Sequence, residues 1–327
     1  MTATWQRELA ESVTRPEALI AALGLSVEHL PPARAAAEGF GLRVTRSYLS
    51  RIRRGDPDDP LLRQVLPRAD ELVEAPGYES DPLHESDARR APNLLQKYHG
   101  RALLITTEAC AIHCRYCFRR EFPYAQAREG DGRLRAALEA VAADESLQEI
   151  ILSGGDPLSL SDARLTSITD ALAATSHVRR IRVHTRQPIV LPSRVDEGLL
   201  EWIRGIRLPL VFVLHVNHAN EIDADVREAC ARLRAAGATL LNQSVLLRGV
   251  NDDVGTLESL SGALIDAGVL PYYLHLPDRV RGTAHFDVEE GRARELLSQL
   301  SGRLSGYLVP RLVREVPGAA AKMALPF

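Results

Sequence analysis

The 327-residue chain has little cysteine, methionine and tryptophan, and almost no lysine. It contains four cysteines, and three of them, Cys110, Cys114 and Cys117, lie in one short segment. This clustering excludes the spaced framework of a disulfide-rich secreted protein, and free thiols favour a reducing compartment. Of the 40 basic residues, only Lys97 and Lys322 are lysines. Any chemistry that requires a lysine amine therefore has two candidate residues.

Long hydrophobic runs and a strong net charge are also missing. No segment approaches the ~18 apolar residues that cross a membrane, and the polar start of the chain lacks the apolar core of a signal peptide. The 40 basic and 43 acidic residues give a net charge of −3, which argues against a chain-wide nucleic-acid binder. We therefore expect a cytoplasmic protein that binds neither a membrane nor nucleic acid.

The sequence pattern changes near residue 90. Before it, apolar residues recur at helical spacing, as in Leu19, Ile20 and Leu23, and predict a helical N-terminal region over residues 1–90. After it, short apolar runs alternate with amphipathic helical patterns, which indicates βα units with parallel strands. The predicted strands cover 103–107, 149–153, 181–185, 211–216, 239–246 and 272–276, and the predicted helices lie near 133–144, 161–175, 196–204, 222–236, 255–268 and 288–303. Six such units suggest a barrel with fewer than eight strands or a doubly wound sheet.

Polar motifs lie at or near the ends of these predicted strands. The three clustered cysteines follow the first strand, and the segment 153–156 ends the second. The later strands end in or contain 184–186, 215–218, Gln243 and 275–278. Because the carboxyl ends of parallel strands meet at one edge of a sheet, we expect these motifs to form one active site.

The three cysteines have the spacing CxxxCxxC. A cluster of four irons normally takes four thiolates, so three thiolates would leave one iron open to a small molecule. The alternatives are a zinc site completed by His113 and three thiols that only pack in the core. Zinc is disfavoured because no second pair of cysteines exists, and Cys230 lies alone in an alanine-rich helical pattern that predicts core packing. Burial of the segment is disfavoured by three neighbouring arginines, Arg115, Arg119 and Arg120.

A CxxxCxxC loop after the first strand of a βα series resembles the radical S-adenosylmethionine superfamily. The resemblance implies an α/β fold with a partial (β/α)6 TIM-like barrel over residues 91–304. Cys110, Cys114 and Cys117 would then bind a [4Fe-4S] cluster, and the open iron would bind S-adenosylmethionine. One electron from the cluster would cleave that ligand to a 5′-deoxyadenosyl radical.

The segment of Ser153, Gly154, Gly155 and Asp156 resembles the second-strand motif of that superfamily. Two glycines would let the backbone approach S-adenosylmethionine closely, and Asp156 would orient its cationic amine. His215, near the end of the fourth strand, is a further candidate contact for this ligand. The alternative for the glycine motif is an ordinary β-turn.

Longer blocks resemble the lysine 2,3-aminomutase family, over about residues 90–327. These blocks are 94–104, 117–124, 184–192, 215–222, 242–252, 278–286 and 305–310. Segments 56–66 and 114–120 resemble the branch of that family that supplies β-lysine for modification of elongation factor P. The resemblance implies an isomerase that converts L-lysine to β-lysine, with pyridoxal 5′-phosphate as a further cofactor.

The family resemblance also implies a role for each lysine. Lys322, in a C-terminal tail over residues 305–327, would carry pyridoxal 5′-phosphate, since lysine, unlike arginine, can lose its proton and form a Schiff base. Lys97, Arg101 and Gln243 would grip the phosphate of that cofactor. The alternative for both lysines is ordinary solvation.

Three further residues match the substrate-binding positions of the family. Arg119 would pair with the α-carboxylate of L-lysine, a task that a bidentate guanidinium suits. Asp278 and Glu315 would receive the ε-ammonium of the same substrate. The alternative for these two carboxylates is surface ion pairing with nearby arginines, Arg279, Arg281 or Arg314.

Two departures from the family pattern bear on the role in the cell. No cysteine follows Cys230, so we expect the zinc-binding extension of the free-standing family members to be absent, which favours the elongation factor P branch. Met323 and Ala324 stand where the family usually has Thr-Pro. We expect a reducing protein to donate the electron and a β-lysine ligase acting on elongation factor P to receive the product. The competing functions are metabolic synthesis of free β-amino acids and, in a different class, a zinc-stabilised nucleic-acid-binding module.

Overall fold

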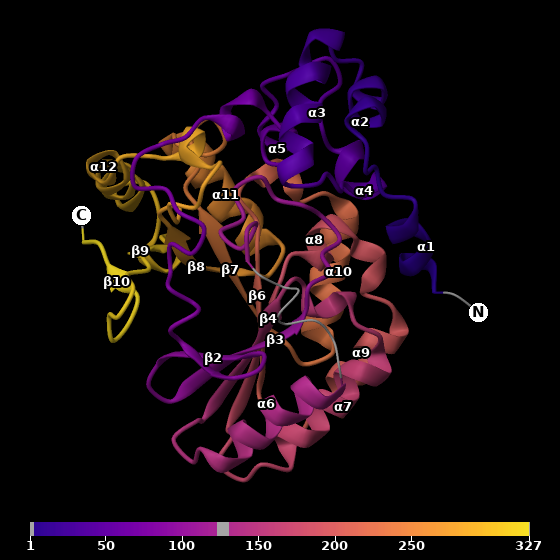
Figure 1. The fold of residues 1–327 in the computed structure, drawn as a ribbon, viewed down its shortest axis with the longest axis vertical. Helices are drawn as coiled ribbons and strands as arrows, with labels where there is room; N and C mark the ends of the chain where they lie inside the picture. Colours follow the sequence, from indigo (N-terminus) through magenta and orange to yellow (C-terminus); the bar gives the residue numbers. More distant parts are fainter. Residues whose placement is uncertain (1–2, 123–130, 327) are drawn as a thin grey trace.

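The structure, a computed structural model, describes residues 3–122 and 131–326. These residues form a ten-stranded sheet whose strands lie in chain order (Figure 1). All six predicted strands are present, and each pairs parallel with the next. They are β3 (Arg101–Thr107), β4 (Glu149–Gly154), β5 (Arg180–Thr185), β6 (Leu210–Leu214), β7 (Thr239–Val245) and β8 (Leu270–His275). Pro123 and Tyr124, which end one of the family-like blocks, lie outside the described residues.

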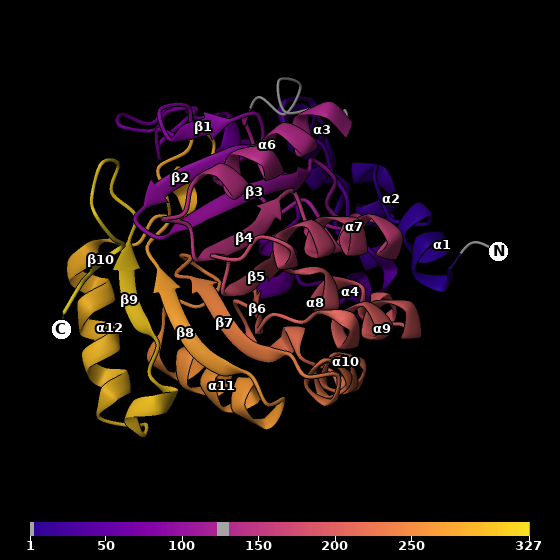
Figure 2. The same ribbon diagram turned by 90° about the horizontal axis from the view of Figure 1, so that it is seen from below.

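Six helices confirm the predicted helical patterns. They are α6 (Asp131–Ala143), α7 (Asp162–Ala173), α9 (Glu197–Gly205), α10 (Ala224–Ala235), α11 (Val254–Asp266) and α12 (Glu290–Ser301). Four of them begin at a residue whose side chain accepts a hydrogen bond from a first-turn amide, which satisfies a donor left open at the helix start. These residues are Ser161, Asp196, Asp223 and Asp253. Figure 2 shows the helices along the outer side of the curved sheet.

Short strands extend both edges of the sheet beyond the prediction. Three of the four pair antiparallel, two before β3 and one after β9, and the fourth, β9, pairs parallel with β8. They are β1 (Arg89–Ala91), β2 (Leu94–Tyr98), β9 (Arg311–Arg314) and β10 (Met323–Ala324). The segment 305–327, expected as a tail, thus contributes two strands. The pattern missed β9 because only Leu312 and Val313 of its residues are apolar.

The N-terminal region is helical, as predicted. Its helices are α1 (Thr4–Ala10), α2 (Pro16–Leu23), α3 (Leu30–Gly39), α4 (Arg46–Ser50) and α5 (Pro60–Arg63). Leu19, Tyr48 and Leu61 are fully buried in the same hydrophobic core as Ile189 of the short α8 (Gln187–Val190). The region therefore packs directly on the barrel. None of the helices in the described residues is long and apolar enough to cross a membrane.

Candidate active site

The loop of Cys110, Cys114 and Cys117 follows β3 at the carboxyl end of the sheet. All three are half-buried free thiols. Burial is the main cause that raises the pKa of Cys110, and it raises the pKa of Cys117 to about 11. A negative charge on Cys114 contributes to both shifts. The sulfurs are thus close enough to influence one another. Three thiolates can be stable together here only when a positive metal centre binds them.

The donor set of this loop does not suit a single zinc ion. In residues 3–122 and 131–326, no three His, Cys, Asp or Glu side chains converge on one point as a metal ion requires. His113, the expected fourth ligand, has its Nδ1 2.9 Å from the Gly41 carbonyl oxygen, and its ring stacks on Phe40. A cluster gives each thiolate its own iron, so the three cysteines fit a cluster better than tetrahedral zinc.

The arginines beside the cysteines are buried, and the expectation that they keep this segment exposed is wrong. Arg115 is fully buried and binds Glu71 through Nε at 2.8 Å and Nη2 at 2.5 Å. Arg120 binds the same carboxylate at 2.7 Å. Arg119 binds Glu85 through Nε and Nη2, each at 2.8 Å. Burial is tolerated because each guanidinium meets a carboxylate from the segment before β1.

The glycines that end β4 allow a close approach within the protein. Gly155 N donates to the Thr107 carbonyl at 2.7 Å, and a β-carbon at Gly155 would collide with the backbone of Glu108 and Ala109. Gly154 has a φ of +113°, which side chains rarely adopt. The glycine pair therefore fixes β4 against the residues that lead into Cys110. The close approach of the backbone to S-adenosylmethionine at these glycines stays a prediction.

Asp156 is fully used by the chain itself. Its Oδ1 accepts from Leu158 N at 3.0 Å and Thr185 Oγ1 at 2.7 Å. Its Oδ2 accepts from Arg186 N at 2.8 Å and Gln187 N at 3.0 Å. A carboxylate has about four acceptor positions, so these bonds fill it. Asp156 therefore positions the residues that follow β5, and its predicted contact with a cationic amine stays a prediction.

A series of ion pairs of alternating sign connects Lys322, through Glu315, Lys97 and Glu85, to Arg119. Lys322 donates to Glu315 Oε2, and Lys97 donates to Glu315 Oε1 at 2.9 Å. Lys97 also contacts Glu85 at 3.2 Å, and Glu85 in turn holds Arg119. Although burial opposes ionisation, the ammonium groups of Lys322 and Lys97 hold the pKa of Glu315 at about 2. The structure thus brings together both lysines and two of the predicted substrate-binding residues.

Asp278 lies near this group. Burial, and then the charge of Glu315, raises the pKa of Asp278 to about 7. The charge of one carboxylate therefore influences the other. The alternative of surface ion pairs is wrong, because the candidate arginines bind other carboxylates. The observed pairs are Arg279 with Asp287 at 3.9 Å, Arg281 with Glu121 at 3.4 Å and Arg314 with Glu290 at 2.8 Å.

Three histidines, His184, His215 and His275, lie at the carboxyl ends of β5, β6 and β8. Gln243 Nε2 lies 2.7 Å from His215 Nε2, which fits an amide donating to a neutral ring, and burial lowers the pKa of His215 to about 3. His184 and His275 each have a buried Nε2 with no hydrogen-bond partner among the described residues. Burial, and then Lys322, lowers the pKa of His275 to about 3. Two orphaned polar atoms on rings that the charge of Lys322 influences are what a site for a polar ligand would leave.

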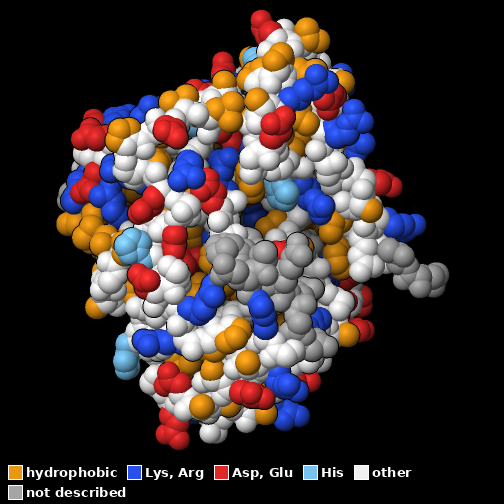
Figure 3. Space-filling model, viewed as in Figure 1, with side chains coloured by type: hydrophobic (Ala, Val, Ile, Leu, Met, Phe, Trp, Pro, Cys, Tyr) orange, Lys and Arg blue, Asp and Glu red, His pale blue; other side chains and the backbone are white. Residues whose placement is uncertain are grey.

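The remaining predicted residues lie at the margins of this site. Ser153 Oγ accepts from Arg119 Nη1 at 3.2 Å. Arg101 begins β3, and its guanidinium lies 4.7 Å from the ring centre of Tyr98. Sequence reasoning missed Glu85, which no local pattern marks. The roles of His184 and His275 were also missed, although both belong to the strand-end motifs. On the face seen in Figure 3, acidic and basic side chains are interspersed, which gives no support there to a nucleic-acid surface.

Comparisons with known proteins agree with this geometry. The model of the radical SAM superfamily matches residues 104–260. An L-lysine 2,3-aminomutase of Escherichia coli is 50% identical over 98% of this chain and 94% of its own length. The enzyme of the same name from Haemophilus influenzae is 42% identical over 97% of this chain and 94% of its own length. The enzyme of that name from Clostridium subterminale is 34% identical over 97% of this chain and 76% of its own length. The chain therefore belongs to the lysine 2,3-aminomutase family of the radical SAM superfamily.

Proposed function

We propose that this chain is an L-lysine 2,3-aminomutase in which Lys322 holds pyridoxal 5′-phosphate and Glu315 and Asp278 receive the ε-ammonium of L-lysine. The observation that supports this most is the meeting of both lysines of the chain at the Glu315 carboxylate. This carboxylate already accepts two ammonium groups. It therefore has the chemistry that a terminal ammonium of a substrate requires.

We assign the [4Fe-4S] cluster of the superfamily to Cys110, Cys114 and Cys117. When bound, the cluster supplies the single electron that cleaves S-adenosylmethionine to an organic radical. The protein contributes three thiol ligands on a loop that Gly155 and Arg115 hold against neighbouring segments. Our candidates for contacts with S-adenosylmethionine are Ser153, Gly154, Gly155, Asp156 and His215.

Pyridoxal 5′-phosphate, when bound, supplies a carbonyl that combines with an amine and a conjugated ring that stabilises an adjacent radical. Lys322 is half-buried, and after burial its charge contributes to the lowered pKa of His184 and His275, whose Nε2 atoms are orphaned. These nitrogens support a polar ligand in this position. We propose Lys97 and Gln243 for its phosphate, with Arg101 at the margin, and Lys97 would then give up one of its two carboxylate partners.

For the substrate, we propose that Arg119 meets the α-carboxylate. Glu85 uses Nε and Nη2, so the carboxylate would be met by Nη1, which contacts Ser153 Oγ at 3.2 Å. For the ε-ammonium, Glu315 is ionised at neutral pH because its pKa is about 2, and Asp278 has a pKa of about 7 and is partly ionised there. Glu315 and Asp278 thus offer carboxylates to the ε-ammonium, and Arg119 offers a guanidinium to the α-carboxylate.

Anaerobic incubation with L-lysine, S-adenosylmethionine, pyridoxal 5′-phosphate and dithionite, followed by chromatography of the products, tests this proposal. β-Lysine should form only when all four are present. Parallel incubations with arginine and glutamate test the ammonium site, because neither carries a terminal primary amine at that distance. Equal turnover of glutamate would contradict the assignment of Asp278 and Glu315.

We further propose that the β-lysine serves modification of elongation factor P, with a reducing protein as electron donor and a β-lysine ligase as acceptor of the product. Segments 56–66 and 114–120, which resemble that branch of the family, support this role. Labelled L-lysine, this protein and the ligase should together place the label on elongation factor P. Release of free β-lysine with no transfer would favour the metabolic alternative.

A further inference from the structure

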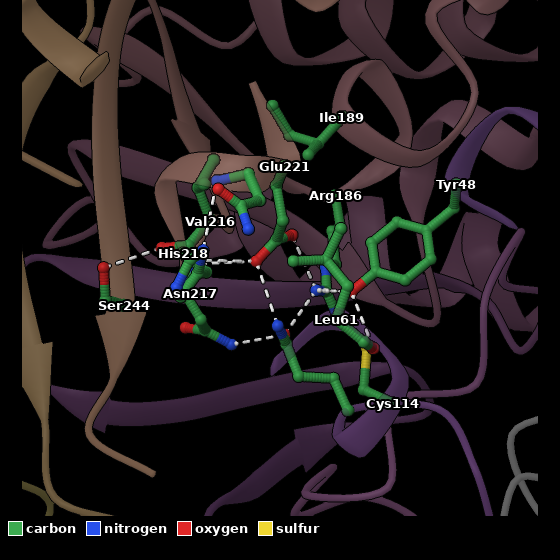
Figure 4. Close-up of polar contacts among 12 residues, drawn as sticks. Tyr48, Leu61, Cys114, Arg186, Ile189, Val216, Asn217, His218, Glu221 and Ser244 are labelled. Carbon is green, nitrogen blue, oxygen red and sulfur yellow. Dashed lines mark hydrogen bonds and ion pairs between the residues drawn. The ribbon is translucent and has the colours of Figure 1, made fainter. Parts of the chain in front are cut away.

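Arg186 lies between β5 and α8 and is only 6% exposed. Its Nη1 donates to Cys114 Sγ at 2.8 Å, and its Nη2 donates to Glu221 Oε2 at 2.8 Å and to Gln64 Oε1 at 2.7 Å (Figure 4). The Nε atom is buried with no hydrogen-bond partner among the described residues. A desolvated cation that cannot lose its proton is thus directed at one of the proposed cluster ligands.

The position of this guanidinium is fixed from two parts of the chain. Glu221 is fully buried, and its Oε1 accepts the backbone amides of residues 217 and 218 at 2.9 and 3.1 Å, so that Oε2 faces Arg186. The N-terminal region contributes Gln64 and the hydroxyl of Tyr48, which lies 3.4 Å from Nη2. The helical N-terminal region therefore has a direct part in holding Arg186 against Cys114.

We infer that Arg186 is a positioning residue that raises the reduction potential of the cluster. Reduction makes the cluster more negative, so a hydrogen bond to a ligand sulfur and a nearby positive charge favour the reduced form. Arg186 is almost fully buried, so water screens its charge poorly. Glu221 has the opposite sign and offsets part of the effect. The inference rests on the proposed assignment of the cluster to Cys110, Cys114 and Cys117.

Redox titration of the anaerobically reconstituted protein, followed by electron paramagnetic resonance, tests this inference in four variants. Arg186→Gln removes the charge, Arg186→Lys keeps it, and Glu221→Gln removes the counter-charge. Arg194→Gln is the matched control, because Arg194 is also fully buried but pairs with Asp162 and Asp196 rather than with a cysteine. Iron content is measured in each variant.

We expect Arg186→Gln to make one-electron reduction about tenfold less favourable, a fall of ~59 mV. The reduction potential should fall less in Arg186→Lys and should rise in Glu221→Gln. The potential of the control, Arg194→Gln, should match that of the wild type. A wild-type potential in Arg186→Gln at full iron content would overturn the inference, as would shifts of the same sign in Arg186→Gln and Glu221→Gln. If Arg186→Gln retains no iron, the test uses the other two variants. The potential must then fall in Arg186→Lys and rise in Glu221→Gln, and any other result overturns the inference. A wild-type protein that takes up no cluster would refute the proposed function itself.

Discussion

Lys97 and Lys322, the two lysines of the chain, bind the two oxygens of one carboxylate, Glu315. Lys97 comes from β2 and Lys322 from the residue just before β10, at opposite edges of the open sheet. The contact therefore joins β2 to the segment between β9 and β10. It also places the two possible amine nucleophiles of the protein in one site, where a substitution can separate their roles.

Lys322→Ala should abolish covalent attachment of pyridoxal 5′-phosphate, because the remaining amine, Lys97, is held by two carboxylates. Borohydride reduction followed by mass spectrometry measures the attachment, and iron content should stay at the wild-type level. Lys97→Gln is the matched control and should retain the covalent adduct. A covalent adduct in Lys322→Ala, or loss of the adduct only in Lys97→Gln, would contradict the assignment of pyridoxal 5′-phosphate to Lys322.

Cys114→Ser should lower the iron content of the reconstituted protein from about four per chain to below about one, since a cluster held by two thiolates is weakly bound. Cys230→Ala is the control, because Cys230 is buried in α10 and should retain full iron. Iron analysis and the visible spectrum measure both. Full iron content in Cys114→Ser would remove Cys114 from the cluster ligands.

Glu315→Gln should destabilise the cofactor-free protein by about 3 kcal/mol at neutral pH, since the fall of the Glu315 pKa from 4.5 to about 2 is stabilising. This contribution is present above the ordinary pKa of 4.5 and is lost as the pH falls towards about 2. Chemical denaturation of the wild type and the variant over a range of pH measures it. A difference that stays constant from neutral pH down to about pH 3 would contradict the assignment.

Asp278→Asn should show the opposite dependence on pH. The folded protein holds the Asp278 pKa at about 7, above its ordinary value of 3.8, so it binds the proton more tightly than the unfolded chain does. The wild type should therefore lose stability relative to Asp278→Asn as the pH rises from about 4 to about 7. Denaturation curves at these two pH values suffice, and a relative gain for the wild type would show that Asp278 is held ionised.

Gly155→Ala should reduce both stability and iron uptake, because the added β-carbon would lie 2.7 Å from the Glu108 carbonyl oxygen, just before Cys110. Gly205→Ala is the control, since no atom lies within 4 Å of a β-carbon built there. We expect a loss of about 2 kcal/mol for Gly155→Ala, in the range for overpacked sites. Equal denaturation midpoints for the two variants would show that the close contact is not rigid.

Hydrophobic periodicity predicted the six central strands and the helices between them, because each buries an apolar face whose repeat matches its own geometry. It did not predict β9 and β10, whose short segments become strands because β8 offers an edge to β9 and β9 offers an edge to β10. For the same reason the burial of Arg115 was missed. Glu71 lies far from it in sequence, and only the folded chain brings its carboxylate within 2.8 Å.

The sequence alone determined the chemistry that is available: three clustered thiols, two lysines and a series of polar strand ends. These depend on residue types and spacing, which folding does not change. Only the tertiary structure decided their partners. It turned Gly155 and Asp156 inward to fix neighbouring loops, joined both lysines at Glu315 and placed Arg186 against Cys114. Such contacts join residues that are distant in the chain, so the packing of complete elements sets them and no local pattern carries them.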